Sequence, residues 1–152
     1  MPLTAPRMRA DILVTASDGT TQLVVEIKRN QGNDIEAVAR ADRKQIKRYA
    51  PHSFFLFVAT QQFWLWSPTA SDPAYRGDTA VLLGRYANLE KIPLVTFDEQ
   101  EFTQLVYSWL GSVTFKSAEA LRQLPGQAWL VDTGLQPLIY RGYIQREAVL
   151  RG

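Results

Sequence analysis

The sequence predicts one α/β (α+β) domain in which a mixed β-sheet is flanked by helices. Apolar segments of strand length alternate with segments of helical periodicity, and a chain of 152 residues fits a single domain. An Asp-Gly pair between the first two apolar segments signals a hairpin, and a helical segment separates the second from the third. We therefore expect a single domain over residues 1–152, with antiparallel and parallel strand pairs in one sheet.

The segments ADILVT and LVVEIK form the first two predicted strands. A two-residue Asp-Gly loop between them pairs Ser17 with Thr20. The same register places Asp11 directly opposite Glu26 on one face of the sheet, with Cβ atoms about 4.5 to 5.5 Å apart. Lys28 shares that face because side chains alternate along a strand.

Two carboxylates and one ammonium group thus converge on the predicted hairpin. Carboxylates at this distance oppose folding unless a proton or a cation compensates them, and Mg²⁺ is a hard cation that prefers oxygen ligands. The pattern therefore indicates a magnesium site held by Asp11 and Glu26. In an alternative interpretation, Glu26 and Lys28 form an exposed ion pair of little energetic value, and Asp11 is an accidental neighbour.

A helix is predicted over residues 34–50. Asn33 followed by Glu36 is typical of an N-cap with its capping-box partner, and Pro51 ends the helix. Helical spacing predicts a buried stripe made of Ile35, Val38, Ala39, Ile46, Tyr49 and Ala50. The outer side of the helix is basic and carries Arg40, Arg43, Lys44, Lys47 and Arg48.

Two further strands follow this helix. The run from Phe54 to Thr60 is unbroken and apolar, as expected of a strand buried on both faces, and FWLWS, which ends before Pro68, is the next strand. A right-handed crossover through the helix makes the second strand of the hairpin parallel to the first of these. Trp64 and Trp66 share one face of the last strand, where we expect them to pack in the core.

The remainder of the chain is expected to contain a loop and shorter elements. Residues 69–77 are predicted to be a loop, and a helix capped by Asp98 and Glu101 is predicted to end at Gly111. Its apolar stripe consists of Phe102, Leu105, Val106, Trp109 and Leu110. Further on, residues 116–124 predict a short helix, and residues 129–140 predict a strand and turn.

Composition narrows the class of protein. The net charge is only +2, so any contact with nucleic acid must come from local basic clusters such as the predicted helix. Cysteine is absent, which excludes disulfides, thiolate metal sites and cysteine nucleophiles. The sequence shows no secretory signal and no apolar run long enough to span a bilayer, so we expect a cytoplasmic protein with no membrane partner.

A second motif stands on the basic helix, where Gln45 and Tyr49 lie four residues apart and share a face. With Asp11, Glu26-x-Lys28 and this Gln-x-x-x-Tyr in order, the chain resembles the PD-(D/E)XK nuclease superfamily, in the RecB-like branch with a QxxxY motif. The resemblance implies a restriction-endonuclease-like core over residues 9–67. It leaves a helical and strand extension over residues 79–152 unexplained.

The resemblance also implies roles for individual residues. Asp11 and Glu26 are expected to bind Mg²⁺ or Mn²⁺, with the Ile27 backbone carbonyl as a further ligand, while Lys28 assists the attacking water. Gln45 matches a residue that orients the site, and Tyr49 one that contacts nucleic acid. DNA is the expected substrate, and the basic side chains that would follow its phosphates are Arg40, Lys44, Lys47 and Arg48.

Two departures from the family pattern leave alternatives open. Ala10 stands before Asp11 in place of proline, and the first family helix, which often carries another acid, is missing because only ten residues precede Asp11. The chain is therefore expected to be shortened, a fragment, or completed by a homodimer partner or another subunit. The alternative functions are a catalytically inactive nucleic-acid-binding module and a protein-interaction module on the same fold.

Overall fold

The computed structural model describes residues 7–29 and 34–151. Its strands are β1 (Arg7–Thr15), β2 (Thr21–Lys28), β3 (Phe54–Ala59), β4 (Gln62–Trp66), β5 (Tyr75–Asp78) and β6 (Tyr143–Arg151). Its helices are α1 (Ile35–Tyr49), α2 (Thr79–Leu83), α3 (Glu99–Val113), α4 (Ala118–Gln123), α5 (Trp129–Asp132) and α6 (Gln136–Ile139), and a 3₁₀ turn, η1, spans Leu94–Thr96.

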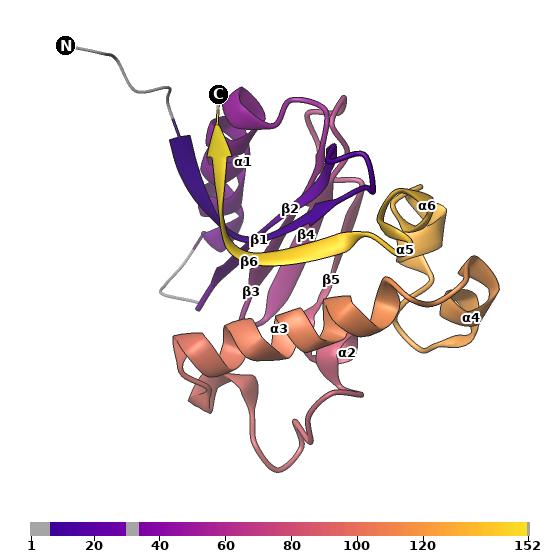
Figure 1. Cartoon of the computed structure of the whole chain (residues 1–152). Helices are drawn as coiled ribbons and strands as arrows, with labels where there is room; N and C mark the ends of the chain where they lie inside the picture. The colour runs from indigo at the N-terminus through magenta and orange to yellow at the C-terminus, as the bar shows by residue number, and fades with distance from the viewer. Residues whose placement is uncertain (1–6, 30–33, 152) are drawn as a thin grey trace.

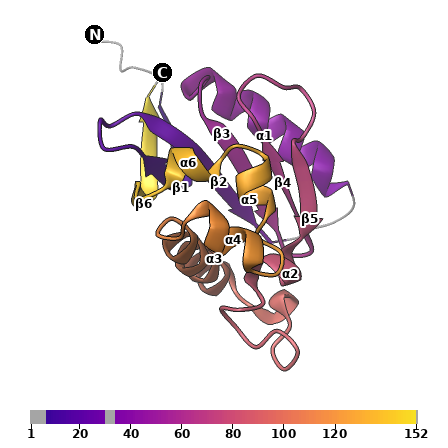
Figure 2. The same cartoon turned by 90° about the vertical axis from the view of Figure 1, so that its right-hand side faces the viewer.

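Within these residues the strands form one mixed sheet in the order β5-β4-β3-β2-β1-β6. Helix α1 covers one face, and α2 to α6 lie on the other side of the sheet (Figures 1 and 2). The predicted α+β class with a mixed sheet and flanking helices is confirmed. No helix in the described ranges combines the length and the apolar character needed to cross a membrane.

The turn between β1 and β2 differs from the prediction. Gly19 N donates to the Ala16 carbonyl and Ala16 N donates to the Thr20 carbonyl, both at 2.9 Å, so the turn contains three residues. Gly19 has φ of 87°, the left-handed conformation that closes a three-residue turn of this kind. The predicted two-residue loop, with Ser17 paired to Thr20, is therefore wrong.

The register of the two strands is nevertheless the predicted one, because a β-bulge compensates for the longer turn. Thr15 pairs with Thr21 but Val14 pairs with Leu23, so Gln22 is an extra residue in β2. Beyond the bulge, the pairs follow the predicted register as far as the last described pair, Ile12 with Val25.

The β2-α1-β3 crossover is confirmed, since β2 and β3 pair in parallel from Leu23 with Phe54 to Lys28 with Ala59. All residues of β3 are buried. The start of α1 differs from the prediction: Asn33 lies outside the described residues, and the N-cap is Asp34, with φ of 64° and no side-chain cap bond. The predicted capping box is therefore absent from the described residues.

Helix α1 packs on the sheet through Ala39 and Ile46, and its C-cap, Ala50, joins the same layer. Trp64 and Trp66 are almost completely buried in this same layer, as predicted. Val38 was predicted to belong to the buried stripe of this helix, but it is 40% exposed, so that part of the prediction is wrong. Ile35 and Tyr49 border the layer and are half-buried.

The second face of the sheet is covered mainly by α3, whose buried side includes the predicted stripe. The capping box at its start is confirmed, since Asp98 accepts from Glu101 N at 2.8 Å and Glu101 accepts from Asp98 N at 3.0 Å. The helix passes through Gly111 and ends at Val113, so the predicted stop is wrong. A glycine at this point is tolerated because the neighbouring turns continue the buried stripe.

Other predictions for the second half of the chain need correction. The segment predicted as a loop over 69–77 contains the start of β5, and the predicted strand over 129–140 forms α5 and α6. The latter segment buries Trp129, Leu130, Leu135 and Ile139, a spacing that suits short helices, and Gly134 separates the two helices with φ of 83°. The predicted short helix over 116–124 is confirmed as α4, capped by Ser117.

Strand β6 was not expected, and it joins the sheet beside β1 from Arg7 to Thr15. The C-terminal region therefore completes the same sheet that contains the hairpin. It also supplies the helices that bury one face of that sheet. The region over 79–152 is thus part of the domain's core.

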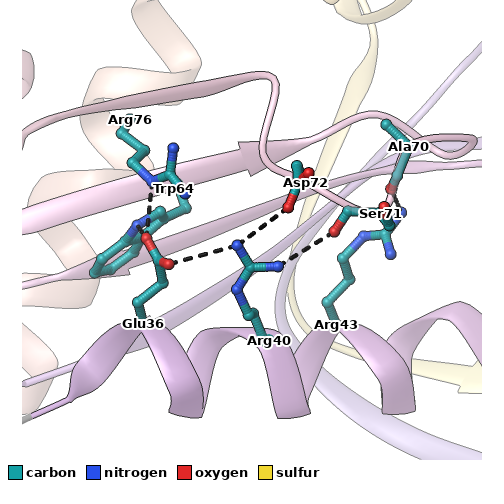
Figure 3. Close-up of polar contacts among 8 residues, drawn as sticks. All are labelled: Glu36, Arg40, Arg43, Trp64, Ala70, Ser71, Asp72 and Arg76. Atoms are coloured by element: carbon teal, nitrogen blue, oxygen red, sulfur yellow. Dashed lines mark hydrogen bonds and ion pairs between the residues drawn. The ribbon is translucent and has the colours of Figure 1, made fainter.

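Glu36 has a structural role that differs from capping. Its carboxylate accepts from Trp64 Nε1 and from Arg76 Nε, both at 2.8 Å, and lies 3.5 Å from Arg40 Nη2 (Figure 3). The hydrogen bond from Arg76, supported by the one from Trp64, holds the pKa of Glu36 below its usual range against the opposing effect of burial. Glu36 therefore ties α1 to strands β4 and β5.

Replacing Glu36 by alanine is expected to lower the free energy of unfolding by about 1 to 3 kcal/mol, because the buried Trp64 indole N–H loses its acceptor. Chemical denaturation followed by tryptophan fluorescence measures this loss. Glu90→Ala, which removes an exposed carboxylate, is the matched control and should change stability by less than about 0.5 kcal/mol. Equal free energies of unfolding for Glu36→Ala and Glu90→Ala would contradict the proposed role of Glu36 in joining α1 to β4 and β5.

Candidate active site

The predicted acid Asp11 lies where β1 separates from β2. Ala10 and Leu13 pack in the same core layer although they are three residues apart, so the alternation of side chains along β1 is interrupted between them. At this point Asp11 Oδ2 accepts from Ile27 N at 2.7 Å. The Asp11 carboxylate therefore takes the place of a backbone acceptor in the ladder, which fixes it against β2.

The second predicted acid, Glu26, is 8% exposed and meets Asp11. Burial, followed by the negative charges of Asp11 and Asp42, raises the pKa of Glu26 to about 8. Burial also raises the pKa of Asp11, against the opposing effect of the Ile27 hydrogen bond. A hydrogen bond joins the two carboxyl groups, so the pair retains a proton near neutral pH.

Lys28 is two residues beyond Glu26 and shares its face of β2. Its side chain is 46% exposed, and Nζ lies 3.6 Å from Asp42 Oδ2 on α1. The positive charge of Lys28 lowers the pKa of both Asp11 and Glu26. The structure thus brings together the three predicted hairpin residues, and Ile27 contributes its N–H; a role for the Ile27 carbonyl as a ligand stays a prediction.

Sequence reasoning missed Asp42. It lies three residues after Ala39 and four before Ile46, so it falls on the buried stripe of α1, and an acid at such a position is the signal that could have revealed it. Asp42 Oδ2 and Glu26 Oε1 are both buried and have no hydrogen-bond partner. Two carboxyl oxygens without hydrogen bonds in the same region attract a cation, and Lys28 Nζ, 3.6 Å from Asp42 Oδ2, supplies one positive charge there.

Glu99 was missed as well. Its charge raises the pKa of Asp11, and both side chains line a cavity of about 880 Å³ between α3 and β6. Other residues that line this cavity include Tyr86, Phe97, Gln104, Arg146 and Glu147. Glu147 has φ of 51° and lies where the β1–β6 pairing passes Asp11, so β6 departs from regular strand geometry beside this acid. No sequence signal links Glu99 to a strand 88 positions earlier.

The Gln-x-x-x-Tyr motif is placed on α1 as expected but is not joined to the acids. Gln45 is exposed and Tyr49 is half-buried, and within residues 7–29 and 34–151 no hydrogen bond connects either to Asp11, Glu26 or Lys28. Their roles stay predictions.

The predicted DNA-contacting side chains of α1 fall into two groups. Lys44, Lys47 and Arg48 are exposed. Arg40 is engaged within the protein, since it pairs with Glu36 and Asp72, and Arg43 donates to the carbonyls of the β4–β5 connection (Figure 3). The exposed group is therefore the part of the basic helix that is free to meet phosphates.

The donor set fits a hard cation such as Mg²⁺ or Mn²⁺. Among the described residues no three side chains of His, Cys, Asp or Glu are grouped closely enough to hold a metal by themselves. Mg²⁺, however, is usually bound by one or two carboxylates and several waters, and Asp11 and Glu26 are two adjoining carboxyl groups, of which Glu26 has a buried oxygen, Oε1, without a hydrogen-bond partner.

Comparisons with protein-family models, with curated proteins and with solved structures found no match to this chain.

Proposed function

We propose that this chain is a Mg²⁺-dependent nuclease with a restriction-endonuclease-like core, of the RecB-like branch of the PD-(D/E)XK superfamily. The observation that carries the proposal is the pair of carboxyl groups of the half-buried Asp11 and the buried Glu26, which shares a hydrogen bond beside Lys28. A buried acid pair that opposes its own ionisation has a cost in stability, and binding a divalent cation removes that cost.

Asp11 and Glu26 would hold the metal, and Glu26 would lose its proton on binding. When bound, Mg²⁺ supplies charge neutralisation at the phosphate and lowers the pKa of an attacking water. Lys28 Nζ, half-exposed and next to the acid pair, donates hydrogen bonds to the water or to a nonbridging phosphate oxygen and so orients the attack.

DNA is the proposed substrate, and the exposed cations of α1 supply affinity. These cations are on α1, which follows β2 in the chain and lies on the same side of the sheet as Lys28 and Asp42. They are Lys44, Lys47 and Arg48. Such cations contact phosphates without reading bases, so binding should weaken steeply with salt.

The second candidate is a nucleic-acid-binding module without turnover. It is favoured by the exposure of Gln45 and by the absence, among the described residues, of a group of three metal-binding side chains. Both candidates predict salt-dependent DNA binding, and they differ in whether a product forms.

The test incubates the full chain with double-stranded and single-stranded DNA in Mg²⁺, in Mn²⁺, or in EDTA. If the chain is a nuclease, cleaved DNA should form in Mg²⁺ or Mn²⁺ and not in EDTA, because a phosphate can approach the two acids only when a cation neutralises their charge. DNA binding without product in both metals would overturn the nuclease and support the inactive module.

A further inference from the structure

We propose that Asp42 is a positioning residue that holds the Lys28 ammonium group beside Glu26. This inference rests on the proposed nuclease function, for which Lys28 is the residue that assists water attack. It assigns a task in the site to a residue of α1 outside the motif Gln-x-x-x-Tyr.

Lys28 needs a partner to fix its position. The side chain leaves β2 on the face covered by α1 and is 46% exposed, so by itself it would sample many rotamers. Asp42 Oδ2 lies 3.6 Å from Nζ, within ion-pair distance. A long cationic side chain that must meet a small target benefits from such a restraint, because misplacement by about 1 Å can reduce a rate by about 10²-fold.

Asp42 itself is held in place by its helix. Ala39 and Ile46, one turn before and one turn after it, are almost completely buried against the sheet, and the Asp42 side chain is 19% exposed. The position of the carboxylate is therefore set by the packing of α1. A carboxylate whose position is fixed by packing can restrict the conformations of the flexible Lys28 side chain.

One carboxylate oxygen of Asp42 lacks a hydrogen bond. Asp42 Oδ2 is buried without a hydrogen-bond partner, and the nearest cation to it is Lys28 Nζ. A buried carboxylate oxygen without a partner is unfavourable unless a charge compensates it. The charge of Asp42 is also felt by Glu26, so all three groups occupy one region. Shortening the Lys28–Asp42 contact by a few tenths of an ångström makes it a charge-assisted hydrogen bond.

The test compares wild type with Asp42→Asn, which keeps the size of the side chain and removes its charge. We expect kcat for metal-dependent cleavage to fall about 10- to 100-fold at unchanged KM for DNA, with partial recovery in Asp42→Glu. Asp132→Asn, which removes an exposed carboxylate paired with Arg122, is the matched control and should keep wild-type kinetics. Unchanged kcat in Asp42→Asn, or an increase in KM alone, would overturn the proposal.

A second measurement separates this proposal from the nuclease proposal. In ¹⁵N NMR of lysine ammonium groups, without metal or DNA, a restrained Lys28 gives a slowly exchanging signal, identified by its loss in Lys28→Arg. The signal should persist in Asp132→Asn and disappear in Asp42→Asn, while circular dichroism confirms that both are folded. A signal that survives in Asp42→Asn overturns the positioning role. If the Lys28 signal disappears in Asp42→Asn but the wild type does not cleave DNA, the Lys28–Asp42 contact is supported and the nuclease proposal is overturned.

Discussion

Replacing Lys28 by alanine is expected to lower kcat for Mg²⁺-dependent DNA cleavage by about 10²- to 10⁴-fold, the usual contribution of a group that assists proton transfer or charge development. Lys28 is the only cation that the structure places within ion-pair distance of Asp42 among the described residues, and its charge acts on both Asp11 and Glu26. Its removal leaves the two candidate metal ligands in place. The variant should therefore still bind metal and DNA.

The measurements are single-turnover cleavage, DNA affinity and thermal unfolding. Lys91→Ala, which removes an exposed lysine far along the chain, is the matched control and should cleave as wild type does. Glu26→Ala should also abolish cleavage, but through loss of the metal site, so its DNA affinity should no longer respond to Mg²⁺. Wild-type cleavage in folded Lys28→Ala or in folded Glu26→Ala would exclude this site.

The hairpin shows what local sequence pattern can and cannot establish. The turn was predicted with one residue too few, yet the strands pair as predicted, because the extra residue Gln22 restores the register. Register decides which packed layer each side chain joins, and a shift by one position would move Ile12 and Val14 from the layer under α3 to the layer under α1. Burial therefore determines the pairing, and the turn and bulge adjust to it.

The candidate site was only partly predictable, because two of its five residues are brought in by tertiary packing. Asp11, Glu26 and Lys28 are close in sequence, and strand alternation brings them together. Asp42 and Glu99 reach the same region from two helices on opposite faces of the sheet. Their approach depends on how α1 and α3 pack, which no short motif encodes.

Short apolar segments were the main source of error in the second half of the chain. Residues 129–140 were predicted as strand and turn because a short apolar run is compatible with both a strand and a buried helix turn. The helical form prevails there since it buries Trp129 against Phe63 and Tyr75, with ring centroids 5.1 and 5.4 Å apart. Tertiary contacts of this kind override weak local preference.

The free energy of unfolding is expected to fall as pH rises from about 5 to about 8, and Glu26→Gln should remove most of this dependence. Glu26 has a pKa of about 8 in the folded protein against 4.5 when unperturbed, so between these values the folded state binds more protons than the unfolded state. Stability therefore decreases with pH across this window. The contribution of the protonated carboxyl is fully present below pH 4.5 and is lost above about pH 8.

The size of this effect makes it measurable by chemical denaturation at a series of pH values without metal. Each pKa unit corresponds to about 1.4 kcal/mol, and allowing for the shared proton with Asp11, we expect Glu26→Gln to exceed wild type by on the order of 2 kcal/mol at pH 8. Glu90→Gln, at an exposed position, should follow the wild-type curve. Mg²⁺ should stabilise wild type at pH 8 and leave Glu26→Gln nearly unchanged, because a cation replaces the proton only where a carboxylate can form. Parallel pH curves for wild type and Glu26→Gln would show that Glu26 ionises freely, and the acid pair would then offer no cation-binding advantage.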